Sequence, residues 1–518
     1  MRSISTSVSK NIAMHTYMNR KLIPLLCLFF ISTSSCKKFL STYSQNKSFV
    51  ESAADLDEVL VGDAYYKYLN QPGDINKSYF HSMDDDAEMG KVENAGAIPY
   101  SYTGFHYWQA EPRMDINGVV QSNDPYFIGL YNKIARINTI LQSIPDLRDK
   151  GEPAAALNRI SGEAHFLRAM YYYILVNLYG KPYNPSSAGT DFGVPLRTDP
   201  TIKDQFIARS STRQVYDQII ADLLDAEKEL EGANQTSTSR ANQAAAQALL
   251  CRVYLYTGNY EKTVLYADKV INTQRYPIKD LNNHTTGDDF LTRSATEVIF
   301  TMGGSAIPDL MRLSDNAASS PFYRVSDELA TSYSPTDLRR QAFFIQSSKG
   351  YLKAAKKRKN INATTNDASD NFLLRISEVY LNRAEALAST DQFEEARNSL
   401  QELRKNRFKP ADLTAITTEG AALMSNIREE RRLDLCFEFH RWFDLRRYAV
   451  NAKYPFSKSI KHKAYANTGS GYTEIGYYEL SPYAQDAAAY IVPIPNDEIE
   501  FNRGMLINEP RPGRPLKQ

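Results

Sequence analysis

Five carboxylates lie close together in residues 428–448 and could form an acid–base site: Glu429, Glu430, Asp434, Glu438 and Asp444. A general acid needs a carboxyl group held apart from cations, because a nearby positive charge keeps the group ionised. The segment is predicted to be helical, and every acid in it has an arginine within helical reach. We therefore interpret the block as ion-paired structure, with Trp442 and Phe443 in the core, and not as a catalytic centre.

The run Asp84-Asp85-Asp86 is the strongest candidate for a metal site. It lacks the alternating ligands and the turn glycine of a calcium loop, so the pattern favours a capping or solvated cluster. The histidines show no H-E-x-x-H spacing and the cysteines show no C-x-x-C spacing, so the sequence does not support a zinc site. We expect no metal, no cofactor and no enzymatic activity.

The charge balance argues against a nucleic-acid partner. The 518-residue chain has a formal net charge of +1, so no overall field attracts a polyanion. One basic run, KAAKKRK at residues 353–359, has no interleaved aromatic residues. It is predicted to be a solvated loop.

The N-terminal residues read as an export signal that ends at Cys36. Positive charge at Asn19-Arg20-Lys21 precedes the apolar run LIPLLCLFFI, which is too short to span a bilayer. Small polar residues then lead into Cys36, which resembles the acylated cysteine of a bacterial lipoprotein, although Thr33 stands where leucine is commoner. An ordinary secretory signal with a coincidental cysteine is the alternative. We expect a signal peptide at 1–35, a lipidated tether at 36–50 and one domain at 51–518. Acylation at Cys36 would anchor the protein firmly, because several acyl chains together hold a protein in a membrane.

Helix pairs are the elements that must position any site. Ala241, Ala245, Leu249 and Val253 share one face of a 3.6-residue period, a turn follows at 257–259, and the pattern resumes at Tyr260. The same design returns at residues 375–404. A small residue, Cys251 or Ala384, lies nine positions before the aromatic residue that opens each second arm, which is the packing logic of tetratricopeptide-type pairs.

The two pairs are too far apart in sequence for a plain tandem array, so long irregular segments must be inserted between helices. Further helices are predicted at 52–69, 126–144, 158–180 and 211–230, and residues 70–125 are predicted to be irregular. The fold class is therefore mainly α, with tetratricopeptide-like pairs, long insertions and a few short strands.

Several segments, in this order, resemble the SusD/RagB family of outer-membrane lipoproteins. They are Cys36 with Phe39-Leu40, GEAHFLRAMYYYILVNLYG (162–180), VYDQIIADL (215–223), RANQAAAQALLCRVYLYTGNY (240–260), RISEVYLNRAEAL (375–387), REERRLDLCFEFHRWFDLRRY (428–448) and VPIPNDEIEFN (492–502). The resemblance covers nearly the whole chain after Cys36. It departs from the family at Phe439, where a glycine or methionine is usual. The family's fold is a single domain, with an N-terminal part at about 51–235 and a C-terminal part at about 290–518.

The resemblance implies a glycan-binding lipoprotein that is anchored in the outer membrane and faces the cell exterior. Its implied partner is a SusC-type TonB-dependent transporter, and the family is not catalytic. A peptide-binding receptor like RagB is the main alternative; a glycoside hydrolase or a helical scaffold for protein partners fits the sequence less well.

Candidate ligand residues follow from what a sugar offers, a C–H face for aromatic rings and hydroxyls for polar groups. The irregular stretch 100–108 concentrates aromatic residues near charged and polar ones, and the resemblance suggests a second aromatic platform at 322–351. For Trp108 the alternative is a buried ring that holds the insertion together. The candidates are Tyr102, Tyr107, Trp108, His81, Asp85, Arg113, Phe322, Tyr323 and Tyr351.

Overall fold

Two helical hairpins lie where the apolar periodicity predicts them. The first joins α8, Gln243–Tyr256, to α9, Tyr260–Ile271, and the second joins α13, Ile376–Ser389, to α14, Phe393–Arg404. Asn242 caps α8, because its side chain accepts the backbone N–H of Ala245 at 2.8 Å. Cys251 and Ala384 are completely buried. Small side chains at these positions let the paired helices approach closely, as the sequence predicts.

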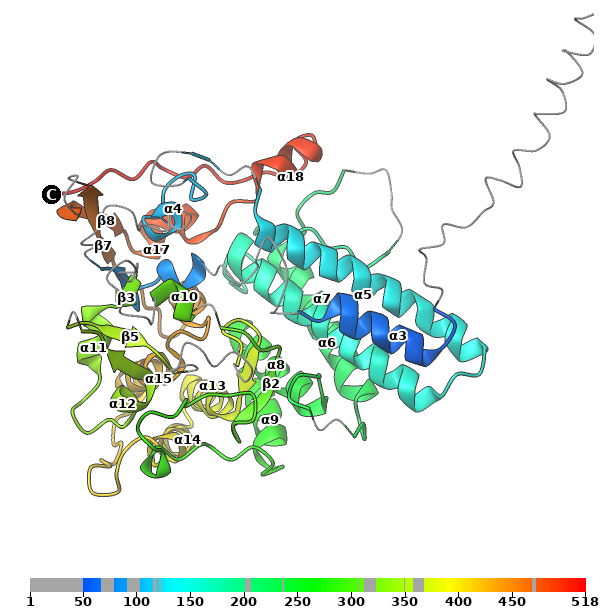
Figure 1. Ribbon diagram of the computed structural model, residues 1–518, viewed down its shortest axis with the longest axis horizontal. Helices are drawn as coiled ribbons and strands as arrows, with labels where there is room; N and C mark the ends of the chain where they lie inside the picture. Colours follow the sequence, from blue (N-terminus) through cyan, green and yellow to red (C-terminus); the bar gives the residue numbers. More distant parts are fainter. Residues whose placement is uncertain are drawn as a thin grey trace, which may run out of the picture. The chain divides into compact units, whose positions relative to one another are not determined.

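The two hairpins stack on each other although a long insertion separates them in sequence. Helix α13 packs against α9 and also against α8 (Figure 1). Helix α15, Gly420–Leu435, continues the stack against α13 and α14, and α16, Arg441–Ala449, follows it. The insertion between the pairs is confirmed, and the helical array is continuous across it.

Long helices from the first half of the chain lie side by side (Figure 1). They are α5, Pro125–Asp149, α6, Ala154–Tyr179, and α7, Thr212–Glu229, with α6 packed against both others. Ser211 begins α7 with a reciprocal capping box to Gln214. Helix α5 is longer than the predicted 126–144 and includes Pro145. Helix α3, Ala53–Val59, continues as a π-helical turn at Leu60–Ala64.

The strands are short and form four antiparallel pairs in the described part of the chain: β1 with β3, β2 with β6, β4 with β5 and β7 with β8. Their bounds are β1 Ala87–Met89, β2 Val298–Thr301, β3 Tyr323–Val325, β4 Phe344–Gln346, β5 Leu352–Ala354, β6 Leu373–Arg375, β7 Ile460–Asn467 and β8 Tyr472–Leu480. Short helices complete the fold: η2 Tyr79–Ser82, α4 Thr103–His106, η4 Leu281–Asn283, α10 Ile307–Met311, α11 Asp327–Ser332, α12 Arg339–Phe343, α17 Tyr483–Asp486, η5 Ala487–Tyr490 and α18 Asn496–Phe501.

The computed structural model describes residues 50–66, 79–90, 103–114, 119–120, 123–200, 206–234, 237–305, 307–311, 323–348, 350–356, 368–467 and 472–518. Residues Ser52–Gln518 form one compact unit. The mainly α fold class is confirmed. None of the helices in these ranges combines the length and the apolar character needed to cross a membrane. Cys36, Tyr102 and Phe322 lie outside the described residues.

Candidate functional site

Trp108 is buried in the early insertion and does not present its ring to solvent. Its side chain is 1% exposed, and its indole N–H donates to the carbonyl of Met83 at 2.9 Å. The ring stacks on the imidazole of His462 from β7, with centroids 4.3 Å apart. These contacts join the segment before β1, the segment after α4 and the β7–β8 hairpin. They match the alternative that Trp108 holds the insertion together.

Most other predicted ligand residues that the structure describes also face inward. The hydroxyl of Tyr107 donates to the carbonyl of Lys463 at 3.1 Å, and the guanidinium of Arg113 donates to the carbonyl of Pro493. Tyr323 lies in β3 and is completely buried. His81, in η2, is buried as well, whereas Tyr351 is only partly buried. Most of the described candidates around β1 and β3 are therefore packed in the interior and do not form an exposed binding surface.

Asp85 belongs to a buried ion-pair cluster. Burial opposes its ionisation, but Arg441 and Arg432 outweigh burial and hold the pKa of this carboxyl well below its usual value. Arg441 Nε donates to it at 2.6 Å, and Lys458 Nζ donates to it at 2.7 Å. Of the two expected alternatives, a solvated cluster is wrong, since Asp84 and Asp86 are buried too, whereas Asp84 Oδ1 accepts the backbone N–H of Asp86 at 3.0 Å, as a capping group does. The arginines that pair with Asp85 and Asp86 lie about 350 residues further along the chain, so the sequence around this run does not reveal them.

Four of the five carboxylates of residues 428–448 are ion-paired, as predicted, whereas Glu429 is exposed. Asp434 lies 2.5 Å from Arg407 and 2.8 Å from Arg375. Asp444 pairs with Arg431 at 2.8 Å and with Arg447 at 2.7 Å. Burial raises the pKa of both acids, but the arginines outweigh it and keep each pKa below its usual value. Many partners come from other elements rather than from the same helix, so the block fastens the helical array.

The basic run at 353–359 is not a solvated loop where the structure describes it. Lys353 lies in β5 and Lys356 lies just after it, and both side chains are buried. The ammonium of Lys356 donates to the Glu438 carboxylate and to the carbonyl of Asp434, the latter at 2.5 Å. Burying Glu438 requires a nearby cation, which explains the position of Lys356. Residues 357–359 lie outside the described residues.

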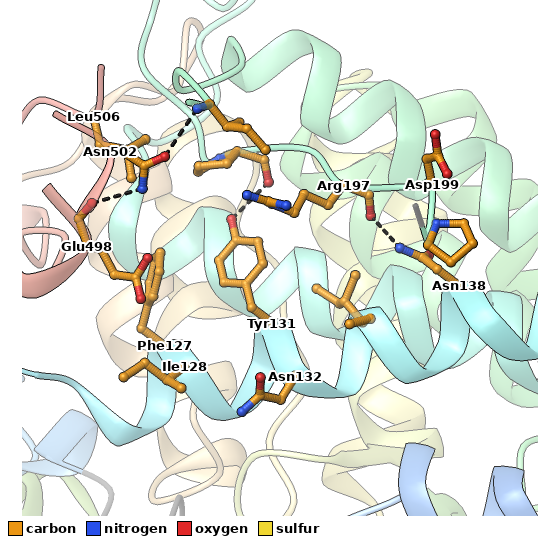
Figure 2. A pocket seen from close by; sticks show the side chains of 15 residues that line it. Phe127, Ile128, Tyr131, Asn132, Asn138, Arg197, Asp199, Glu498, Asn502 and Leu506 are labelled. Carbon is orange, nitrogen blue, oxygen red and sulfur yellow. Dashed lines mark hydrogen bonds between the residues drawn. The ribbon is translucent and has the colours of Figure 1, made fainter. Parts of the chain in front are cut away.

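A pocket of about 280 Å³ opens along α5 (Figure 2). One face of α5 forms its floor, residues 195–200 with Ile207 form a second wall, and α18 with the segment after it forms a third. An aromatic surface lies beside groups that exchange hydrogen bonds, which is the combination that a sugar ring requires. The polar and aromatic lining residues are Phe127, Tyr131, Asn132, Asn138, Arg197, Asp199, Glu498 and Asn502.

Hydrogen bonds fix the walls of this pocket to its floor. The hydroxyl of Tyr131 donates to the carbonyl of Pro195 at 2.8 Å, and the amide of Asn138 donates to the carbonyl of Arg197 at 2.9 Å. Burial raises the pKa of Glu498 although Arg197 lowers it. Figure 2 shows Glu498 and Asp199 at opposite ends of the pocket, with Tyr131 between them. The pocket therefore offers acidic groups at both ends of an aromatic surface.

No pattern in the sequence indicated this pocket. Phe127, Tyr131 and Asn138 lie on one face of α5, at helical spacing, so the stripe itself could have been recognised. The other two walls come from residues about 65 and about 370 positions further along the chain, and no motif links them to α5.

Family models match two parts of the chain. Residues 314–511 match a model described as the SusD family, and residues 38–255 match a model described as starch-binding associating with outer membrane. SusD-like protein P2 of Formosa agariphila is 24% identical over 449 residues, covering 77% of this chain and 83% of that protein. SusD-like protein P38 of the same organism is 24% identical over 452 residues, covering 72% and 85%.

Solved structures share the fold. A SusD superfamily protein from Bacteroides thetaiotaomicron has a TM-score of 0.68 at 23% identity and covers 89% of this chain and 100% of that chain. A SusD-like carbohydrate binding protein from Bacteroides vulgatus has a TM-score of 0.66 at 20% identity, covering 88% and 97%. The arrangement of helices described above is thus that of these proteins.

Proposed function

Because the chain belongs to the SusD/RagB family, we propose that it is a cell-surface receptor that captures oligosaccharides and passes them to a SusC-type TonB-dependent transporter. The descriptions of a matching family model and of one structural neighbour, starch binding and carbohydrate binding, support a glycan as the ligand. Acylation of Cys36 would anchor the protein in the outer membrane, facing the exterior.

The pocket on α5 is the structural observation that supports a glycan as the ligand of this protein. The ring of Tyr131 supplies an apolar face, and Asn132, Arg197 and Glu498 supply hydrogen-bonding groups around it. A volume of about 280 Å³ is small, so the pocket would hold a short part of a chain rather than a long oligosaccharide. Millimolar binding, about −4 kcal/mol, is within reach of a few such contacts. A polymer gains avidity when many tethered receptors bind it.

Affinity electrophoresis of the purified full-length protein tests this proposal, with gels that contain amylopectin, xylan or pectin. Tyr131→Ala removes the aromatic face, whereas Tyr131→Phe keeps the ring and removes only the hydroxyl that donates to Pro195. We expect one polysaccharide to retard the wild type and the Phe variant. The Ala variant should bind about tenfold more weakly, as a lost stacking contact of about 1.4 kcal/mol requires.

Two results would count against the proposal. Equal retardation of the Ala and Phe variants would remove the α5 pocket as the glycan site. No retardation by any polysaccharide would overturn glycan capture and favour the alternative, a peptide-binding receptor. If several subsites act together, oligosaccharides should bind more tightly than monosaccharides, and equal affinities would contradict an extended site.

A further inference from the structure

A second cavity, of about 420 Å³, lies between α15, α16 and the segment 453–458. Met424, Arg428 and Arg432 point to it from one face of α15, since they follow one another at intervals of four residues. None of its lining residues also lines the pocket on α5. The cavity is therefore a separate feature of the protein.

Cations dominate the lining of this cavity. Arg428, Arg432, Arg441, Lys453 and Lys458 face two carboxylates, those of Glu328 and the exposed Glu429. Four of the five cations are paired within the part of the chain that the structure describes. The pairs are Arg432 with Asp86 (2.8 Å), Arg441 with Asp85 (2.6 Å), Lys453 with Asp391 (2.7 Å) and Lys458 with Glu328 (2.5 Å).

Arg428 is the exception. Its side chain makes no ion pair with any described residue, although Arg428 is only 9% exposed. The guanidinium lies over the ring of Tyr448, 4.1 Å from its centroid, and Nη1 donates to the carbonyl of Tyr454 at 2.8 Å. Nε and Nη2 are buried and have no hydrogen-bond acceptor among the described residues. Buried donors without an acceptor are rare and costly in proteins, and an arginine fork suits a two-oxygen anion.

An aromatic rim adjoins the Arg428 guanidinium. Phe456 is 43% exposed, and its backbone N–H donates to the carbonyl of Tyr448 at 2.9 Å, which holds the segment 453–458 against α16. Tyr454, which is partly buried, lines the cavity beside it. Rings next to an arginine can cover the C–H face of a sugar while the arginine binds its charged substituent.

We propose that this cavity binds an acidic sugar, with the carboxylate of a uronate or the sulfate of a sulfated sugar on Arg428 and the sugar ring against Phe456. The anion supplies the acceptors that Nε and Nη2 lack. The inference that the anion belongs to a sugar rests on the proposed glycan capture. The cavity's preference for an anion rests only on the contacts of Arg428.

Ligand-observed NMR titrations of the purified full-length protein with glucuronate, glucose 6-sulfate and glucose test this proposal. At least one of the two acidic sugars should bind at least tenfold more tightly than glucose, and 0.5 M NaCl should weaken that binding. Arg428→Gln should reduce affinity for that sugar about tenfold. Arg397→Gln is the matched control, because it removes an arginine whose ion pair with Glu419 is partly exposed and lies outside the cavity.

Phe456→Ala keeps the test decisive if the Arg428 variant fails to fold, since the exposed ring can be removed with little effect on packing. It should weaken binding of the acidic sugar and leave the unfolding midpoint unchanged. Glucose binding as tightly as both acidic sugars would overturn the proposal. Unchanged affinity in both the Arg428 and the Phe456 variant would overturn it as well. Neither result bears on retardation by a polysaccharide at Tyr131, so failure here and failure of glycan capture can be told apart.

Discussion

Phe439 should tolerate glycine better than alanine, the reverse of the usual order. This residue lies between α15 and α16 with φ of +67°, a left-handed conformation that costs an L-residue roughly 1–2 kcal/mol. Phenylalanine offsets the strain by packing, because its ring is buried and meets Phe80 and Phe443 with centroids 4.5 Å and 4.7 Å apart.

Two opposing effects set the magnitude. Removing the buried ring costs about 3 kcal/mol in either variant, at the lower end for Phe→Ala because the side chain is not fully enclosed. Phe439→Ala keeps the left-handed strain, whereas Phe439→Gly releases it. The released strain exceeds the extra chain entropy of glycine by about 1 kcal/mol. The glycine variant should therefore be destabilised by about 2 kcal/mol and the alanine variant by about 3 kcal/mol.

Urea unfolding followed by the fluorescence of the two tryptophans measures this difference, since Trp108 and Trp442 are both buried. Phe443 is the matched control. It is a buried phenylalanine inside α16, where glycine should be worse than alanine by about 1 kcal/mol. If Phe439→Ala is as stable as Phe439→Gly while the Phe443 pair keeps its usual order, the argument from backbone strain is wrong.

Three further predictions use the same urea assay. Trp108→Ala should lower the free energy of unfolding by about 3–5 kcal/mol, since it removes a buried ring and its bond to Met83, and an unchanged midpoint would contradict a structural role. Burial lowers the pKa of His462 from 6.5 to about 4, so on acidification the imidazole of the unfolded chain is protonated before that of the folded chain. The contribution of His462 to stability should be full above about pH 6.5 and be lost as the pH falls through 4, and a flat pH profile would contradict this. Lys356→Met should cost about 3 kcal/mol by removing one of the cations that pair with the buried Glu438 carboxylate, and no loss would mean that its remaining partners, Arg375 among them, suffice.

Periodic features were predictable from the sequence, and contacts between distant segments were not. The helix pairs follow from apolar spacing that each hairpin carries within about 30 residues. Trp108 could not be assigned to a surface or to the core, because its neighbour His462 lies about 350 residues away. Lys356 was predicted to be solvated for the same reason: its carboxylate partner, Glu438, lies about 80 residues further along the chain.

The α5 pocket shows the same limit at a functional site. Tyr131 faces a wall that begins at Pro195 and another that contains Glu498, and only folding brings the three segments together. Residue types alone could not select these side chains, because tyrosines are abundant in this chain and most of those described are buried. Aromatic richness instead pointed to the segment 100–108, where the described rings are buried.

The stacking of α13 on α9 has a consequence for how the chain folds. In a tandem repeat array, each unit docks on the one just made, and order spreads from neighbour to neighbour. Here the next unit begins about 100 residues downstream of Ile271. Helix α13 can therefore pack on α9 only after the segment of that length between them has closed into a loop. Closing such a loop costs about 4 kcal/mol of chain entropy before α13 makes any contact. Synthesis past α13 should therefore be a condition for completing the array, and a chain cut short before Ile376 would leave the apolar side of α9 uncovered.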